Sequence, residues 1–233
     1  MEKPDIDMAL LYTRATDGLM MVKVATEQDF QDIYDYGVDV FFNIETLGWS
    51  MEKKDYHIVP ECYIDTNITE FLLDSHGVNH QKGCNAVAKK MMESNLKDQF
   101  SVGIIDNDKR QHSYVTEFTE IAHTQHITLL KHKERSHYFI RISPAMDQFI
   151  LDCAAEQGIN LQDYGLPSTL SELTQITKDV KAKNDYRFKN LFAAIENSSE
   201  MHLFYSVLQY LNESKYDCEI SALKDLFETE TGT

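Results

Sequence analysis

Residues 101–105 (SVGII) constrain the fold of this chain most. They lack the alternation of polar and apolar side chains that a half-exposed strand shows, and this pattern is typical of a strand covered on both faces inside a parallel sheet. Patterns of strands and helices alternate around it from residue 56 to residue 143. Such alternation predicts right-handed βαβ units and a parallel or mixed sheet flanked by helices, which is an α/β fold.

The elements expected in this core follow from hydrophobic period and from turn residues. The first helix of the core is expected to have Thr66 or Asn67 as its N-cap and Gly77 as its C-cap. Pro60 predicts that the first strand of the core is an edge strand or a bulged one. We expect strands at 56–64, 101–105, 126–133 and 137–143, with helices at 66–77 and 85–95.

Two further regions flank the core at residues 56–143. Residues 1–55 predict a β-rich extension packed on the core, with strands at 8–15, 19–25 and 38–45 and a helix at 26–37. Residues 144–233 predict a helical C-terminal region, which begins with Ser143 as an N-cap and Pro144 at the first helical position. Its helices are expected at 143–158, 169–184, 185–198 and 200–214, with a short one closing the chain.

Composition limits the class and the compartment. A net charge of -16 excludes a protein that coats nucleic acid non-specifically, because phosphate contacts need Lys and Arg. The four cysteines form no CxxC pair and indicate reduced thiols of a cytoplasmic protein. No run of about 18 apolar residues is present, and the first ten residues lack a basic segment followed by an apolar one. We therefore expect neither a membrane span nor a signal peptide.

The charge is unevenly distributed. Residues 1–60 hold 12 acidic against 5 basic residues, whereas residues 109–141 hold 6 basic against 3 acidic residues and five of the nine histidines. The basic stretch indicates either a nucleic-acid face or a solvated hairpin. The candidate phosphate-binding residues are Lys82, Lys109, Arg110, Lys131, Lys133 and Arg141.

Asp106 and Asp108 follow the buried strand directly, one residue apart. On an extended backbone they point to the same side, at the carboxyl end of a central strand, where open α/β sheets place their sites. Two neighbouring carboxylates repel each other unless a cation lies between them, and Mg²⁺ or Mn²⁺ takes such oxygen ligands. The alternative is a β-turn, because DNDK is also good turn sequence. Glu61, in the preceding strand, adds a third carboxylate.

The segments PECYIDTNITEFLL and VGIIDNDKR resemble the TOPRIM domain, and among its members the small nuclease-like proteins of bacterial defence systems related to the overcoming-lysogenization-defect nucleases. The resemblance covers roughly residues 56–150. It implies a TOPRIM-like sheet, Glu61 and Asp65 as catalytic residues, and Glu61, Asp106 and Asp108 as ligands of Mg²⁺ or Mn²⁺. Asp147 matches an acid that some relatives carry. Cys62 stands where the family usually has glycine, and Pro60 before Glu61 is unusual.

Three classes of function remain open. The first is a Mg²⁺-dependent nuclease, a phosphodiester hydrolase with a role in antiviral defence. The second is a regulatory or binding module that keeps the fold without catalysis, and the third is an acidic interaction protein. The acidic balance favours action with a protein partner or as a homo-oligomer, because a free nuclease this acidic would be slow to find its substrate. The chain has no glycine-rich phosphate loop of its own, so any ATP hydrolysis is expected on a separate ATPase partner. A zinc site at His123 and His126 lacks a complete ligand set, and a proton-shuttle role for His112 competes with a plain surface histidine.

Overall fold

The computed structural model describes residues 9–15, 18–24, 55–75, 77–107 and 112–231, and the chain divides into two compact units, residues 1–51 and 52–233. The first unit contains the antiparallel hairpin of β1 (Ala9–Ala15) and β2 (Gly18–Val24). These are the two strands predicted at 8–15 and 19–25. The helix predicted at 26–37 and the strand predicted at 38–45 lie outside the described residues, and the packing of this extension on the core stays a prediction.

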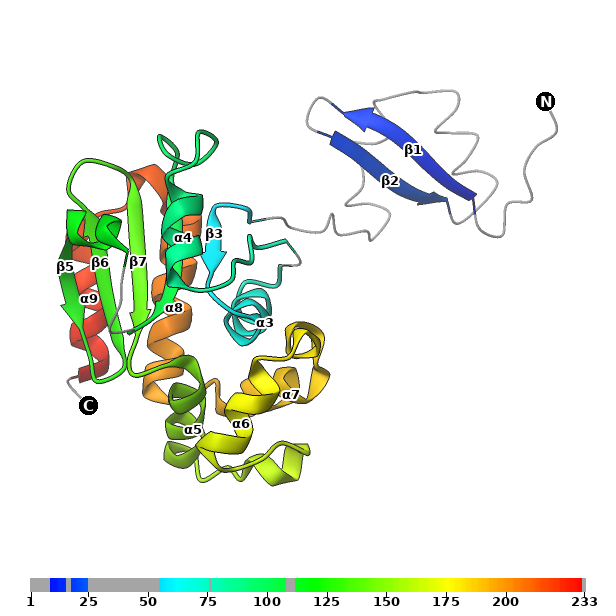
Figure 1. The fold of residues 1–233 in the computed structure, drawn as a ribbon, viewed down its shortest axis with the longest axis vertical. Coiled ribbons are helices and arrows are strands. Elements are labelled where there is room, and N and C mark those ends of the chain that lie inside the picture. The colour runs from blue at the N-terminus through cyan, green and yellow to red at the C-terminus, as the bar shows by residue number, and fades with distance from the viewer. Residues whose placement is uncertain (1–8, 16–17, 25–54, 76, 108–111, 232–233) are drawn as a thin grey trace. The chain divides into compact units, whose positions relative to one another are not determined.

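The second unit is built on a mixed five-stranded sheet with the strand order β3-β4-β7-β6-β5 (Figure 1). Strands β3, β4 and β7 run parallel, whereas β5 and β6 are antiparallel to their neighbours. This confirms the prediction of an α/β fold with a mixed sheet flanked by helices. The strands are β3 (Ile58–Pro60), β4 (Ser101–Asp106), β5 (Phe118–His123), β6 (Ile127–His132) and β7 (His137–Ile142).

Strand β4 is the buried strand that the sequence predicts. Residues 101–105 are all buried, and β4 lies between two parallel neighbours, β3 and β7. Strand β5 was not expected, since its middle is exposed and its apolar content is low. It forms because β6 supplies an antiparallel partner at the edge of the sheet.

Strand β3 is much shorter than the predicted 56–64, because a helix begins at Tyr63. It is an edge strand of the five-stranded sheet, as Pro60 predicts. Its outer edge is nevertheless covered by the segment 79–83. The amides of Asn79 and Gln81 donate to the carbonyls of Ile58 and Pro60 over 2.8 and 2.9 Å. This segment brings the start of the next helix beside the end of β3.

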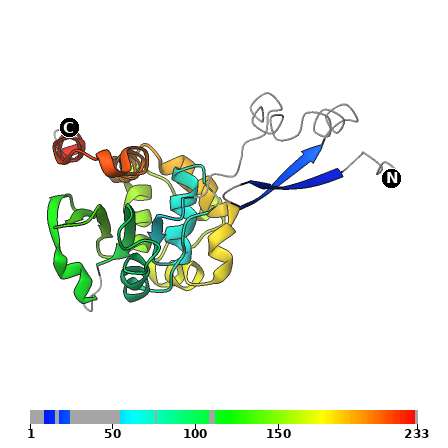
Figure 2. The ribbon, with the colours of Figure 1, turned by 90° about the horizontal axis from the view of Figure 1, so that it is seen from above.

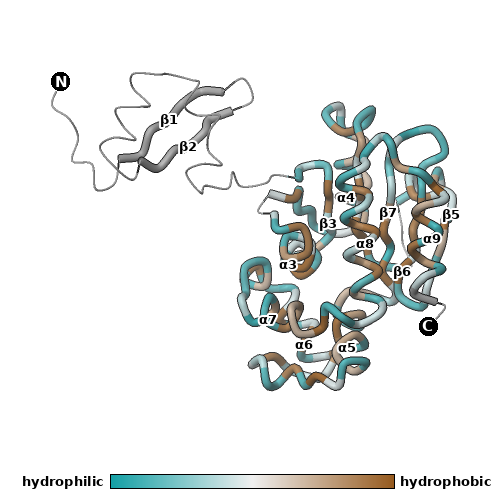
Figure 3. The backbone as a smooth tube through the Cα atoms, turned by 180° about the vertical axis from the view of Figure 1, so that it is seen from behind, coloured by the Kyte–Doolittle hydropathy of each residue, from teal (hydrophilic) through white to brown (hydrophobic). Residues whose placement is uncertain are grey.

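The two faces of the sheet carry different helices, and the views in Figures 1 and 2 show them as layers. One face packs on α4 (Cys84–Met91) through Val59, Ile105 and Phe139. The other face contributes Ile104 and Ile140 to the larger core, which the remaining helices complete. In Figure 3 the hydrophobic positions, in brown, lie along the sheet and along the long helix α8.

The helices after the sheet confirm the predicted helical C-terminal region. No described helix is both long and apolar enough to cross a bilayer. The helices not yet given are α3 (Tyr63–Leu72), α5 (Met146–Glu156), α6 (Leu170–Thr177), α7 (Tyr186–Ile195), α8 (Ser199–Ser214) and α9 (Ile220–Thr231). A short 3₁₀ helix, η3 (Ser113–Glu117), precedes β5. Three others connect consecutive helices of the C-terminal region: η4 (Leu161–Tyr164), η5 (Val180–Asn184) and η6 (Lys215–Asp217).

Four predicted details of the helices are wrong. The C-cap of α3 is Leu73 rather than Gly77. Helix α3 begins after Cys62 rather than at Thr66 or Asn67, because the carboxylate of Asp65 accepts a hydrogen bond from the Cys62 amide and caps the helix earlier. The N-cap of α5 is Ala145 rather than Ser143. The helix predicted at 169–184 is interrupted after α6, because Asp179 accepts a hydrogen bond from the Lys181 amide and starts η5.

Candidate functional site

Glu61 and Asp106 lie together at the carboxyl ends of two adjacent parallel strands. Pro60, the last residue of β3, is in register with Ile104 of β4, so Glu61 and Asp106 leave the sheet at the same edge. The amide of Asp106 donates a hydrogen bond to Oε2 of Glu61 over 2.9 Å. Glu61 is only 7% exposed. The structure therefore brings together these two of the predicted metal ligands.

Asp106 also organises the start of α5. Its Oδ1 accepts a hydrogen bond from the amide of Met146, the first residue of that helix, over 3.0 Å. A carboxylate is favourable at this position because the first amides of a helix lack partners and carry partial positive charge. Asp106 thus joins the end of β4 to the first helix of the C-terminal region.

Asp65 completes a group of three carboxylates, from the first turn of α3. Its Oδ2 accepts the Cys62 amide over 3.1 Å, and its Oδ1 is buried without a hydrogen-bond partner among the described residues. Burial raises the pKa of this carboxyl well above its usual range, and the charges of Asp106 and Glu61 raise it further. The three side chains therefore concentrate negative charge at one edge of the sheet. Asp108, the third ligand that the sequence predicts, lies outside the described residues.

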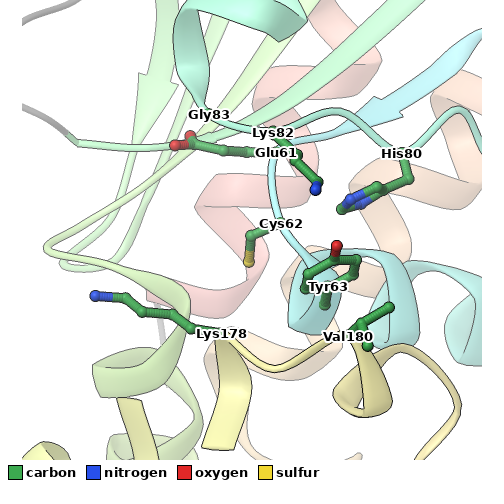
Figure 4. Close-up of a pocket in the computed structure, with 8 residues that line it drawn as sticks. All are labelled: Glu61, Cys62, Tyr63, His80, Lys82, Gly83, Lys178 and Val180. Atoms are coloured by element: carbon green, nitrogen blue, oxygen red, sulfur yellow. The ribbon is translucent and has the colours of Figure 1, made fainter. Parts of the chain in front are cut away.

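A pocket of about 410 Å³ opens beside Glu61. Figure 4 shows the side chain of Lys82 extending toward His80 and that of Lys178 extending away from Cys62 and Tyr63. Lys82 comes from the loop before α4 and Lys178 from the connection between α6 and η5. The pocket is lined by Glu61, Cys62, Tyr63, His80, Lys82, Gly83, Lys178 and Val180.

One wall of the pocket is a pair of stacked rings. The rings of Tyr63 and His80 are 4.5 Å apart and nearly parallel, and Nδ1 of His80 is 2.9 Å from Oγ1 of Thr66. The hydroxyl of Thr66 donates its proton to the carbonyl of Cys62 over 2.8 Å. It therefore acts as the acceptor in its contact with His80, and Nδ1 of His80 is the donor. Nε2 of His80 is buried without a partner among the described residues. Burial lowers the pKa of His80, and the charges of Lys183 and Lys82 lower it further.

Cys62 does not offer a nucleophile. Burial raises the pKa of its thiol far above the usual range, and the nearby carboxylates of Asp65 and Asp106 act in the same direction. Because the thiolate is the reactive form of cysteine, this side chain stays inert at neutral pH. Cys62 is therefore a packing and capping residue.

The predicted phosphate-binding residues are spread over the sheet. Arg141 is in register with Ile105, so its side chain lies on the opposite face from that of Asp106. Lys131 is in register with Tyr138, which pairs with Val102 near the start of β4, about 13 Å along the strand from Asp106. Lys133 follows at the same end. Of the described candidates only Lys82 lies beside the carboxylates, and Lys109 and Arg110 lie outside the described residues.

Other polar residues that the sequence singles out have structural partners. Nδ1 of His112 accepts the amide of Tyr114 and caps η3. Nδ1 of His126 donates to the carbonyl of Ser143, and Asp147 accepts the hydroxyl of Thr174 on α6. Nδ1 of His123 lies 2.7 Å from Glu120. Within the described part of the chain no group of three or more His, Cys, Asp or Glu side chains is arranged to hold a metal ion.

Sequence reasoning missed Lys178 and Lys183. The signal was present, because residues 178–189 carry five basic and two acidic residues within a strongly acidic chain. The helix predicted at 169–184 would have spread Lys178, Lys181 and Lys183 around its circumference. The break after α6 instead places Lys178 on the pocket and Lys183 within electrostatic reach of His80.

Comparison of the chain with protein-family models, with curated proteins and with solved structures gave no match in any of the three. The resemblance to TOPRIM domains therefore depends on the two sequence motifs around Glu61 and Asp106.

Proposed function

We propose that this chain is a divalent-metal-dependent phosphodiester hydrolase that acts on nucleic acid, with its site at the carboxyl ends of β3 and β4. The observation that carries the proposal is the meeting of Glu61 and Asp106 from two parallel strands, joined by the 2.9 Å hydrogen bond. Open α/β sheets place their sites at such strand ends.

The donor set is suited to Mg²⁺ or Mn²⁺. Glu61 and Asp106, together with Asp108 just beyond the described part of β4, would hold the ion through carboxylate oxygens. Burial first, and then the charges of Asp106 and Glu61, raise the pKa of Asp65, and a divalent cation would offset the repulsion among these neighbouring carboxylates. When bound, the metal polarises a phosphoryl oxygen and lowers the pKa of a coordinated water.

The protein's own residues supply the remaining functions. The Asp106 amide fixes the orientation of the Glu61 carboxylate, and Asp65 fixes the first turn of α3 behind it. Lys82 and Lys178, which both line the pocket, would bind a phosphate group beside Glu61. The net charge of -16 slows an unaided encounter with nucleic acid, so we include a protein partner or a second copy of the chain in the proposal, in a defence role.

A second candidate is a regulatory module that keeps this architecture without turnover. It is favoured by the structural use of both carboxylates, since Glu61 accepts the Asp106 amide and Asp106 accepts the Met146 amide. These contacts would persist after catalysis was lost.

The test is a cleavage assay on supercoiled DNA and structured RNA, with Mg²⁺, Mn²⁺ or chelator. The variants are Glu61→Gln and Asp106→Asn, and the control is Glu134→Gln, an exposed carboxylate in the β6–β7 turn at the opposite end of the sheet. Metal-dependent cleavage by the wild type and the control, lost in both site variants, is expected. A metal-dependent rise in melting temperature without cleavage would select the regulatory module, and no effect of metal on either property would overturn both.

A further inference from the structure

The segment 178–183, here called the lysine segment, carries three lysines and begins at the pocket. Lys178 and Lys181 are exposed and Lys183 is half-buried. None of the ion pairs among the described residues involves these lysines or Lys82. In a chain with 38 acidic and 22 basic residues, a cluster of cations without carboxylate partners forms a local positive patch that attracts anions.

The positive field of this segment reaches the pocket. Lys178 lines it directly, and Lys183 acts on His80 together with Lys82 from the other wall. Two cations, Lys82 and Lys178, therefore line the cavity that also contains Glu61, and Lys183 lies within electrostatic reach of His80 in its wall. The segment and the carboxylate site are contiguous.

The lysine segment is held rigidly on α3 through its backbone. Asn67 is fully buried, and its Nδ2 donates to the carbonyl of Ala182 over 2.6 Å and to the carbonyl of Asp185 over 3.3 Å. Ala182 itself is buried in the core. The surrounding lysine side chains are therefore presented from a fixed backbone, which reduces the entropy lost when they bind a ligand.

Apolar groups are exposed within and directly after the lysine segment. Val180 is 62% exposed, and Tyr186, the first residue of α7, is 71% exposed, the most of any large hydrophobic side chain in the described residues. Arg187 is tied to Asp185 and to the carbonyl of Gly165, so α7 starts from a fixed position. Cations that follow a backbone, next to an exposed aromatic ring, are the combination that single-stranded nucleic acid binds, through phosphates and stacked bases.

We propose that the lysine segment, with Lys82 and Tyr186, is the surface that binds a single strand of nucleic acid and leads it to Glu61. The assignment of nucleic acid rests on the proposed function, whereas the location of the surface rests on the contacts above. This surface replaces residues 131–141 as the binding face, because Lys131 and Lys133 lie at the far end of the sheet from the carboxylates.

The experiment measures binding without cleavage. The full chain is titrated against a fluorescently labelled single-stranded oligonucleotide of about 16 nucleotides. The titration is carried out in chelator and read by anisotropy over a series of salt concentrations. The variant carries Lys178→Ala, Lys181→Ala and Lys183→Ala, and the matched control carries Lys97→Ala, Lys133→Ala and Lys224→Ala, three exposed lysines away from the pocket. Both variants change the net charge equally, and circular dichroism checks that both fold.

The lysine-segment variant should bind about tenfold more weakly or worse, and its salt slope should fall by about 2, at about 0.7 per phosphate contact on a single strand. The matched control should bind like the wild type. Replacing the same three lysines by arginine should preserve binding. Tyr186→Ala should weaken binding roughly fivefold or more without changing the salt slope, because stacking is not an ionic contact.

Equal loss in the two triple variants, tighter binding of the duplex than of the single strand, or no binding by the wild type would overturn the inference. Because the measurement is made in chelator, absence of cleavage in the earlier assay leaves this result unaffected. Binding at the lysine segment by a chain that never cleaves would uphold the surface and reject the hydrolase.

Discussion

The amide of Asp106 and the carboxylate of Glu61 are joined by a 2.9 Å hydrogen bond between residues 45 positions apart in the sequence. Removing the acceptor while leaving the amide buried costs about 1–3 kcal/mol. We expect Glu61→Ala to lower the free energy of unfolding by that amount. Glu61→Gln should cost less, since its amide oxygen can still accept, and urea denaturation of the two variants in chelator measures the difference. Equal loss in both would mean that the charge rather than the hydrogen bond stabilises the fold.

Asp65 should make the protein less stable as the pH rises. Its pKa is raised in the folded state above the usual value of 3.8, by burial first and then by the charges of Asp106 and Glu61. Between these two pKa values the folded chain binds more protons than the unfolded chain, so stability falls with increasing pH. Asp65→Asn keeps an acceptor for the Cys62 amide but carries no charge.

We therefore expect Asp65→Asn to gain stability relative to the wild type as the pH is raised above about 4, when melting temperatures are compared in chelator. Addition of Mg²⁺ should narrow the gap, because a bound cation offsets the charge that the variant lacks. A difference in melting temperature that stays constant from acid to neutral pH would show that Asp65 is ionised without penalty.

His137 should produce the opposite dependence. It is fully buried between the hydroxyl of Tyr114, 2.6 Å from Nδ1, and the carbonyl of Leu96, 3.0 Å from Nε2. Burial lowers the pKa of His137 below its usual value of 6.5, so the unfolded chain binds more protons when the pH falls through this range. Stability is therefore fully present above pH 6.5 and is lost as the pH falls below it.

Tyr114→Phe removes the hydrogen bond to this histidine, together with the longer one of 3.4 Å from Nη1 of Arg135 to the same hydroxyl. Nε2 of His137 donates to Leu96, so Nδ1 is an acceptor that loses its only described donor in the variant. We expect a loss of about 1–3 kcal/mol in the free energy of unfolding at neutral pH. The matched control is Tyr205→Phe on α8, whose hydroxyl makes no described hydrogen bond in the structure, and it should stay close to the wild type. If both variants behave alike, the Tyr114–His137 contact contributes nothing.

Gly103 tolerates no side chain at the centre of β4. An added Cβ would overlap the ring of Phe139 on β7 and come within 2.9 Å of Sδ of Met91 on α4. We expect Gly103→Ala to destabilise by about 1–3 kcal/mol, the usual cost of overpacking a core. Combining it with Phe139→Leu should recover part of that loss, and thermal denaturation of the single and double variants tests the coupling. Additive losses would place the strain elsewhere.

The sequence predicted the elements whose pattern is strong. The apolar run at 101–105 and the period of the helices after residue 144 gave β4 and the C-terminal helices, because burial of these side chains decides their structure. The meeting of Glu61 and Asp106 was also predictable, since both acids follow strands expected in a parallel sheet.

Two of the remaining differences come from local capping hydrogen bonds that hydrophobic period does not register, and one comes from the arrangement of the sheet. The start of α3 depends on a side chain of its own first turn, and the break before η5 depends on Asp179 competing with the helical backbone. The separation of Lys131 from Asp106 depends on the antiparallel turn of β6 onto β7, whereas a chain of parallel units would have placed the basic residues elsewhere. Local charge density alone therefore could not predict how far Lys131 and Lys133 lie from the carboxylates.

Asn67 holds the carbonyls of Ala182 and Asp185, which are groups that every amino acid possesses. The lysine side chains of segment 178–183 can therefore change by mutation while the backbone of the segment stays attached to α3. Natural variation or laboratory evolution can therefore retune what this surface recognises in small steps, with little effect on folding.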